Sequence, residues 1–236
     1  MKEKSVHRMI RILKLLKDIV SGRCSWMVIW YAIANRYHML FKTGNRQHEF
    51  DKLYSIDSDP WDYRGSLYER EKYARTMDAV ESMGGSAGCV LEVGASVGEF
   101  TKLLAQRYKS VVAIDISQVV VTQVAGAGPP ANVEYQVAGI ESFSWGQTFD
   151  IMFCCEVLYY IGSDKVDIVV DQIRKLVADK GFLVLVTGLG DGDDGIYFDG
   201  WDKIFSEVFT EVFRVKYAKS ERPYKIVIYM VSSLQG

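Results

Sequence analysis

The sequence predicts an α/β fold with a mostly parallel sheet, a C-terminal antiparallel hairpin and extra N-terminal helices. From residue 88 onward, short apolar runs alternate with helical patterns, and each run is apolar throughout, as in parallel strands that are covered on both faces. Two β-rich runs on either side of Pro223 then break this alternation and predict a hairpin from Thr210 to Ser232. A chain of 236 residues with 49% hydrophobic residues can fill one such domain, but not two.

The elements follow from these runs in order. A polar break at 42–47 is followed by residues 50–63, which we expect to form a shaped loop because Pro60 disfavours helical geometry at Asp59. Ser66 is expected to cap the next helix, with Glu69 at the capping-box position. Strands are then expected near 88–93, 110–115, 132–137, 148–154 and 181–188, with helices near 97–108, 117–126 and 164–178.

The N-terminal segment differs in character from the rest of the chain. Residues 1–23 carry seven basic and two acidic side chains, and their apolar residues recur at helical spacing. The apolar run Cys24–Ala34 is shorter than the about twenty residues that span a bilayer. We predict that residues 1–47 form a helical extension that packs on a domain at 48–236. A helix that binds a membrane surface or a partner is the alternative.

Composition excludes several classes of function. Lys and Arg total 28 against 30 Asp and Glu, so no overall charge attracts the protein to nucleic acid. Four cysteines without a C-x-x-C pair predict reduced core residues in a cytoplasmic protein. Three histidines, at 7, 38 and 48, lack ligand spacing, so the sequence predicts neither a metal site nor a histidine-centred triad.

A glycine turn after the first core strand predicts a nucleoside site. Gly94 and Gly98 let a ligand approach the backbone, and the free N–H groups of the following helix face the same crevice. Asp115, at the end of the next strand, can accept both hydroxyls of a ribose. The spacing Glu92-x-Gly94-x-Ser96-x-Gly98 differs from the dinucleotide fingerprint, so no pyrophosphate is implied.

Several motifs occur in one order with compact spacing: Asp59-Pro60-Trp61-Asp62-Tyr63, Tyr68-Glu69-Arg70-Glu71-Lys72-Tyr73, the glycine turn, Phe149-Asp150 and Glu156-Val157-Leu158-Tyr159-Tyr160-Ile161. This combination resembles the NodS-like branch of class I S-adenosylmethionine-dependent methyltransferases over roughly residues 48–188. The resemblance implies a Rossmann-like fold with a mostly parallel seven-stranded sheet and S-adenosyl-L-methionine as cofactor. Members of that branch include an N-methyltransferase that acts on the free amine of a partly deacetylated chitooligosaccharide.

The resemblance also implies roles for individual residues of this chain. Glu156 and Tyr160 would face the methyl group, with Glu156 as the candidate base or, alternatively, as a partner of the cofactor's ammonium group. The family's usual Asp after the third strand is replaced by Ala138-Gly139-Ile140, so adenine would be bound there by backbone groups or by Glu141. The cofactor-binding residues that the resemblance implies are Trp61, Tyr68 and Tyr73 as a lid, Glu92, Gly94, Ser96 and Gly98 around methionine, Asp115 on ribose, and Ile116, Gly139 and Ile140 near adenine.

The leading functional hypothesis is methylation of a small molecule, with an amine or amino sugar as the acceptor. An O-methyltransferase that acts on a glycan or a lipid-linked metabolite is the first alternative, and a binding protein that no longer catalyses is the second. The loop with Asp191, Asp193 and Asp194 can either attract a cationic amine or be a plain solvated loop. We expect a small-molecule partner and no nucleic-acid partner.

Overall fold

The computed structural model describes residues 46–84, 88–189, 196–220 and 222–232. All of them except Arg46 belong to one compact unit, Gln47–Gly236. The predicted N-terminal helices and the loop with Asp191, Asp193 and Asp194 lie outside the described residues, and the domain boundary at 47/48 stays a prediction. In the described part of the chain, no helix is long and apolar enough to cross a membrane.

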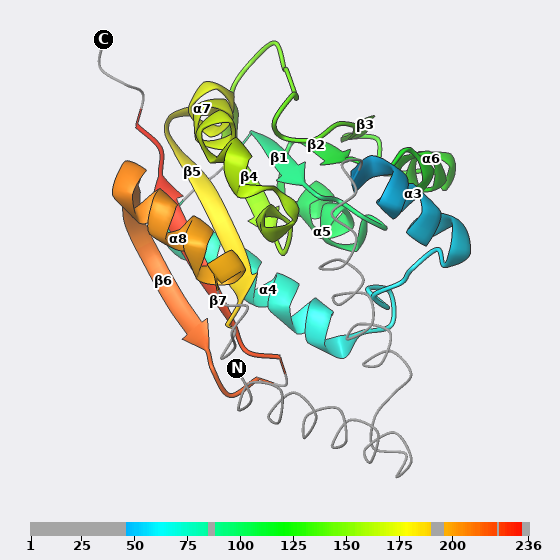
Figure 1. Ribbon diagram of the computed structural model, residues 1–236, viewed down its shortest axis with the longest axis horizontal. Coiled ribbons are helices and arrows are strands. Elements are labelled where there is room, and N and C mark those ends of the chain that lie inside the picture. Colours follow the sequence, from blue (N-terminus) through cyan, green and yellow to red (C-terminus); the bar gives the residue numbers. More distant parts are fainter. Residues whose placement is uncertain (1–45, 85–87, 190–195, 221, 233–236) are drawn as a thin grey trace, which may run out of the picture. The chain divides into compact units, whose positions relative to one another are not determined.

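Seven strands form one sheet in the order β3-β2-β1-β4-β5-β7-β6 (Figure 1). The first five strands in the chain pair in parallel, whereas β7 runs antiparallel to both β5 and β6. This arrangement confirms the predicted parallel sheet with a C-terminal antiparallel hairpin. The strands are β1 (Cys89–Val93), β2 (Ser110–Asp115), β3 (Val133–Val137), β4 (Phe149–Cys155), β5 (Val177–Gly188), β6 (Thr210–Tyr217) and β7 (Tyr224–Met230).

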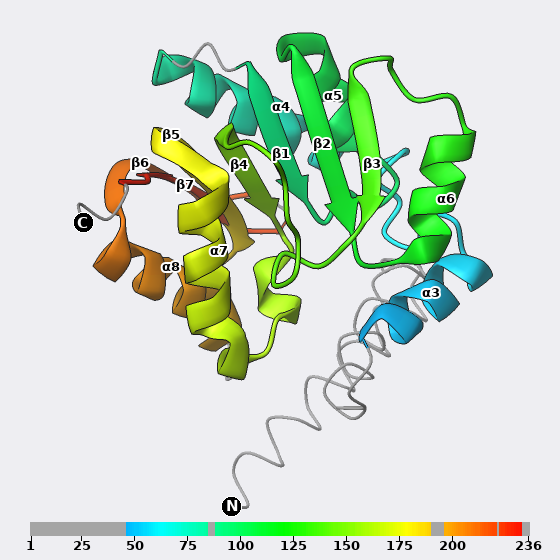
Figure 2. The ribbon, with the colours of Figure 1, turned by 90° about the horizontal axis from the view of Figure 1, so that it is seen from above.

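Helices cover both faces of this sheet, because its central strands present apolar side chains on both sides (Figure 2). Apolar residues of the edge strands β3 and β6 instead alternate with exposed polar residues, so the expectation that every strand is apolar throughout was wrong there. Helices α4 and α5 pack on one face, and α7 and α8 pack on the other. Helix α6 packs beside β2 and β3, where α3 contacts it. The helices are α3 (Arg46–Ile56), α4 (Leu67–Ser82), α5 (Glu99–Arg107), α6 (Gln118–Gly126), α7 (Val166–Leu176) and α8 (Ile196–Val208).

Three elements differ from the sequence prediction. Residues 50–56 belong to α3 and not to a loop, because Pro60 restricts only the residue before it and leaves the earlier backbone free to coil. Strand β5 begins at Val177, before the predicted start, and Lys180 with a φ of +61° marks an irregularity that a pattern of apolar residues does not reveal. Helix α8, between β5 and the hairpin, was not expected.

The start of α4 is partly as predicted. Ser66 caps the helix, and its Oγ accepts a hydrogen bond from the Glu69 N–H at 3.2 Å. The capping box is not completed, because the Ser66 N–H donates to the Asp62 carbonyl at 3.0 Å. The Glu69 carboxylate instead turns inward, where its residue is only 2% exposed. This buried carboxylate becomes part of the site described next.

Candidate active site

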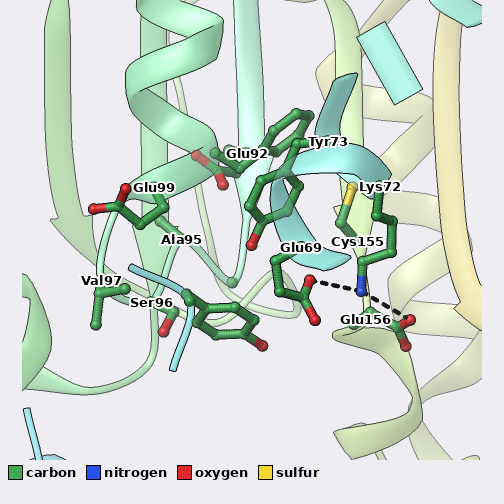
Figure 3. Close-up of a pocket in the computed structure, with 13 residues that line it drawn as sticks. Glu69, Lys72, Tyr73, Glu92, Ala95, Ser96, Val97, Glu99, Cys155 and Glu156 are labelled. Carbon is green, nitrogen blue, oxygen red and sulfur yellow. Dashed lines mark hydrogen bonds and ion pairs between the residues drawn. The ribbon is translucent and has the colours of Figure 1, made fainter. Parts of the chain in front are cut away.

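A pocket opens where β1 and β4 end, between the glycine turn and the first turns of α4 (Figure 3). After β1 the chain crosses to β2 on one side, whereas β4 lies on the other side, so the pocket is at the point where strand order reverses. Ligands of open α/β sheets bind at such points. The lining residues are Tyr63, Glu69, Lys72, Tyr73, Glu92, Gly94, Ala95, Ser96, Val97, Glu99, Phe100, Cys155 and Glu156.

The glycine turn leaves no room for side chains. Gly94 and Gly98 have φ angles of +79° and +77°, in the left-handed region that favours glycine. A Cβ atom on Gly94 would lie 2.6 Å from a methyl carbon of Val157, and one on Gly98 would lie 2.4 Å from the Tyr135 hydroxyl oxygen. Ser96 also has a positive φ, of +49°. Backbone conformation and the packing of Val157 and Tyr135 therefore favour glycine at both positions.

Asp115 holds this turn in place. Its Oδ2 accepts a hydrogen bond from the Ser96 N–H and its Oδ1 from the Ser117 N–H, both at 2.9 Å. Burial raises the pKa of this carboxyl and the N–H donors lower it, with a net rise above its ordinary value. Because each carboxylate oxygen can accept a second hydrogen bond, Asp115 can brace the turn and still bind a ribose.

Helix α3 covers the same end of the sheet. The Asp51 Oδ1 accepts hydrogen bonds from the Ser117 Oγ at 2.7 Å and the Val119 N–H at 3.1 Å, so α3 supplies a cap for α6. One turn further along α3, the Tyr54 hydroxyl lies 2.6 Å from the Ser96 Oγ. Neither contact was expected, because the sequence around Pro60 favours a loop over these residues.

An aromatic cluster surrounds α3. The Trp61 ring lies 5.6 Å from that of Tyr54 and 5.9 Å from that of Tyr63, between ring centroids. The Tyr160 ring meets Phe50 edge-on at 5.2 Å. Trp61 and Tyr160 thus lie in this cluster, and neither is among the residues that line the pocket. Tyr63, which the sequence analysis did not select, joins the cluster to the pocket.

Glu92 is buried beneath the pocket, with 4% of its surface exposed. The Thr101 hydroxyl donates a hydrogen bond to its Oε2 at 2.5 Å. Burial raises the pKa of Glu92 to about 8, although the Thr101 hydrogen bond opposes that rise. At neutral pH the proton is therefore retained in this structure, and a cation that enters the pocket would favour its release.

Opposite the glycine turn, two carboxylates share one ammonium group (Figure 3). The Lys72 Nζ lies 2.8 Å from the Glu69 Oε2 and 3.5 Å from the Glu156 Oε1. Burial lowers the pKa of Lys72, but Glu156 and Glu69 raise it more, so the net pKa is above the ordinary value. Among the described residues, the Glu69 Oε2 has this ion pair but no aligned hydrogen bond.

Backbone geometry and a fourth charge complete this group. Glu156 has a φ of +54° and its N–H donates to the Val186 carbonyl at 2.9 Å, which fixes the residue where β4 ends. The Arg222 guanidinium lies 3.1 Å from the Glu69 Oε1. Two carboxylates and two cations therefore balance within the group, and a further charged ligand must rearrange these pairs.

The structure brings together only part of the predicted site. Tyr68 borders a second cavity, Gly98 begins α5, and Ile140 is buried in the core with 1% exposure. Asp115, Ile116 and Gly139 are not among the residues that line the pocket. The predicted residues that do line it are Tyr73, Glu92, Gly94, Ser96 and Glu156.

Glu69 and Lys72 are the chief residues that sequence reasoning missed. A signal was available, because Glu69, Tyr73, Thr76 and Val80 recur at the spacing of one helical face. A charged residue within an apolar face is unusual unless it has a buried partner. The expected role of Glu69 in a capping box at the start of α4 led away from this interpretation.

Comparison with known proteins identifies the family. The family model described as "Nodulation protein S (NodS)" matches residues 44–190, more than half of the chain. The chain belongs to the NodS family. Nodulation protein S of Rhizobium tropici is 26% identical over 175 residues, which are 72% of this chain and 72% of that protein. Nodulation protein S of Sinorhizobium fredii (strain NBRC 101917 / NGR234) is 27% identical over 152 residues, or 64% and 65% of the two chains.

Solved structures of methyltransferases have the same fold. N-methyltransferase NodS from Bradyrhizobium japonicum WM9, in complex with S-adenosyl-L-homocysteine, superposes with a TM-score of 0.68 and 22% identity over 79% of this chain and 99% of that one. The magnesium protoporphyrin IX methyltransferase of Synechocystis PCC 6803, with bound S-adenosylmethionine, reaches 0.62 at 15% identity over 81% and 100%. At such identities these structures show the fold alone.

As a NodS-family member, the protein is an S-adenosylmethionine-dependent methyltransferase of small molecules, which sets aside a non-catalytic role. The chemistry of the lining suits the methionine end of this cofactor, which carries both an ammonium and a carboxylate group. The pocket offers the Glu156 carboxylate, the Glu92 carboxyl, which a cation would favour in its charged form, and the ammonium of Lys72. Gly94 lines the pocket with its backbone, while Val157 fills the place that a side chain at this position would take.

Proposed function

We propose that the protein N-methylates an amine or amino sugar. The observation that carries this proposal is the pair Glu69 and Glu156, which already hold one ammonium group, that of Lys72, in a largely buried corner of the pocket. Such a corner has the charge and the hydrogen-bond acceptors that a protonated amine needs. The N-methyltransferase NodS from Bradyrhizobium japonicum WM9, which shares this fold, supports the same acceptor class.

In this proposal, each wall of the pocket binds a different part of the reactants. Asp115 accepts hydrogen bonds from ribose hydroxyls, Glu92 pairs with the methionine ammonium, and Lys72 with the methionine carboxylate. When bound, S-adenosylmethionine supplies a methyl group on a positively charged sulfur. Tyr63, Tyr73 and Phe100 exclude water from the pocket that they line. Nothing else is needed to make the methyl group reactive.

The protein then has two tasks toward the acceptor. It must align the amine, and alignment lowers barriers of this kind by roughly 7–11 kcal/mol. It must also leave the nitrogen with a free electron pair, and Glu156 accepts the proton that the ammonium form gives up. Glu156 suits this task because its fixed backbone at the end of β4 points the residue into the pocket.

An acceptor screen tests the proposal. We would incubate the full chain with S-adenosylmethionine and matched pairs that differ only in a free amine, such as glucosamine and N-acetylglucosamine, and follow S-adenosylhomocysteine release. We expect turnover only with the free amine and, by mass spectrometry, the methyl group on nitrogen. Methylation of a hydroxyl in both members of a pair would contradict N-methylation and favour the O-methyltransferase alternative.

Glu156→Gln tests the role of the carboxylate in the same assay. The amide keeps the size of the side chain but cannot accept the proton, so we expect turnover to fall by roughly 10²–10⁴-fold. Affinity for S-adenosylmethionine, measured by calorimetry, should stay within a few-fold. An equal fall in both quantities would instead make Glu156 a binding residue for the cofactor.

A further inference from the structure

A second cavity, of about 670 Å³, lies on the other side of α4's first turn. It is bounded by α4 and by the end of β6 with the turn that follows it. Since Tyr217 and Gly188 both pair with Tyr224, this turn lies at the edge of the sheet where β5 ends. The lining residues are Leu67, Tyr68, Glu71, Arg75, Lys216, Tyr217, Ala218, Lys219 and Ser220.

The charge of this lining is mainly positive. Glu71 is its one acidic residue, and the carboxylate is already paired with Arg75 at 3.1 Å. Lys216 and Lys219 are exposed, and in the described part of the chain neither ammonium group has an ion-pair partner. The lining therefore carries two uncompensated positive charges. Such a surface attracts an anion.

Aromatic rings hold the guanidinium groups of this region in fixed positions. Arg75 lies 4.8 Å above the centre of the Tyr217 ring, and one of its nitrogens is 3.3 Å from the Tyr224 hydroxyl. The Tyr217 ring is in turn stacked on Tyr224 at 4.7 Å. A planar guanidinium that is already oriented loses little entropy when it binds an oxyanion, and its N–H groups match the geometry of one.

The second cavity is separated from the active-site pocket by a single wall. Tyr68 lines the second cavity, and the next residue, Glu69, lines the first. The Tyr68 hydroxyl donates to the Arg222 carbonyl at 2.7 Å, and the Arg222 guanidinium pairs with Glu69. The first turn of α4 and the Arg222 contacts therefore form the wall that the two cavities share.

We propose that this second cavity binds an oxyanion, a phosphate, sulfate or carboxylate, that the methyl acceptor carries. The assignment rests on the proposed function for the acceptor itself, but the anion site stands on its own lining. The cavity is many times larger than a bare oxyanion, which leaves room for the sugar or other group that bears it. An acceptor of this kind would place its amine beside Glu156 and its anion beside Lys216 and Lys219.

Binding is tested by nuclear magnetic resonance on the full chain, through the backbone amides of Ala218 and Lys219. The probes are inorganic phosphate, glucosamine 6-phosphate and glucosamine, each at constant ionic strength. We expect saturable shifts with both phosphates, tighter binding of the sugar phosphate, and no shift with glucosamine. Equal affinity for the two phosphates would overturn an acceptor subsite, and absence of saturable shifts would overturn the anion site.

A matched pair of double variants supplies the control. Lys216→Gln with Lys219→Gln should weaken glucosamine 6-phosphate binding at least tenfold, since it removes both uncompensated charges. Lys109→Gln with Lys175→Gln makes the same change in net charge. These two residues come just before β2 and β5 begin, at the edge of the sheet opposite the second cavity, so this double variant should leave binding within a few-fold. Equal losses in the two doubles would overturn the proposal. Because the readout is binding, it succeeds or fails independently of methyl transfer.

Discussion

The two walls of the pocket are built in different ways. The glycine wall, from Gly94 to Phe100, presents backbone whose shape depends on left-handed φ angles and on hydrogen bonds to Asp115. The α4 wall presents charged side chains, and its central pair, Lys72 and Glu156, is 84 residues apart in the chain. Local backbone geometry thus shapes the glycine wall, whereas the fold brings together the charges of the α4 wall.

The sharpest test of this contrast compares two lysines, Lys72 on the α4 wall and Lys102 on α5, just after the glycine wall. Lys72 and Lys102 each pair with a glutamate three residues earlier, but only the Lys72 side chain is buried, at 5% exposure against 55% for Lys102. Lys72→Met leaves Glu69 and Glu156 as buried carboxylates without their shared cation. We expect a loss of about 3–5 kcal/mol in the free energy of unfolding, measured in urea.

Lys102→Met is the matched control, and because its pair is exposed we expect a change of about 0–1 kcal/mol. Adding Glu69→Gln to Lys72→Met should recover part of the lost stability, because it removes one uncompensated charge. Equal costs for the two single variants would contradict the difference between the walls.

This difference also explains what the sequence could predict. The strands, the glycine turn and Asp115 follow from short contiguous patterns, so the fold and the glycine wall could be predicted. The group of Glu69, Lys72 and Glu156 depends on packing α4 against the end of β4, and no local pattern encodes that distance. The Ile140 side chain belongs to the core, so the adenine contact that the resemblance implies there stays a prediction for its backbone.

Beneath the glycine wall, the acidic side chain of Glu92 is buried, and no cation among the described residues pairs with it. Its pKa of about 8 in the folded protein exceeds the ordinary value of 4.5. Below pH 4.5 both states are protonated and there is no penalty. Between pH 4.5 and about 8 the unfolded state releases a proton that the folded state retains, so stability falls as pH rises. The cost should reach roughly 4 kcal/mol at pH 8.

Glu92→Gln isolates this effect, since glutamine does not titrate. We expect the free energy of unfolding of the native protein, relative to that of the variant, to decrease from pH 5 to pH 8 and then level off. Urea titrations at each pH measure it in the absence of cofactor. Parallel curves for the two proteins would show that the Glu92 carboxyl has an ordinary pKa when folded.

The smallest expected effect is that of Asp115→Ala, which tests whether the glycine turn determines affinity for the cofactor. Asp115→Ala removes the acceptor for the Ser96 and Ser117 N–H groups. Hydrogen bonds to a charged group contribute about 1.5–3 kcal/mol, so we expect at least a tenfold weaker affinity for S-adenosylmethionine in calorimetry, with the fold retained.

Asp51→Asn is the control, since Asp51 caps α6 from α3 without contacting the glycine turn, and its loss should leave affinity within a few-fold. Unchanged affinity in Asp115→Ala would remove this residue from the cofactor site. Equal losses in both variants would instead assign the effect to the start of α6, and the glycine wall would then depend on α3 as much as on its own turn.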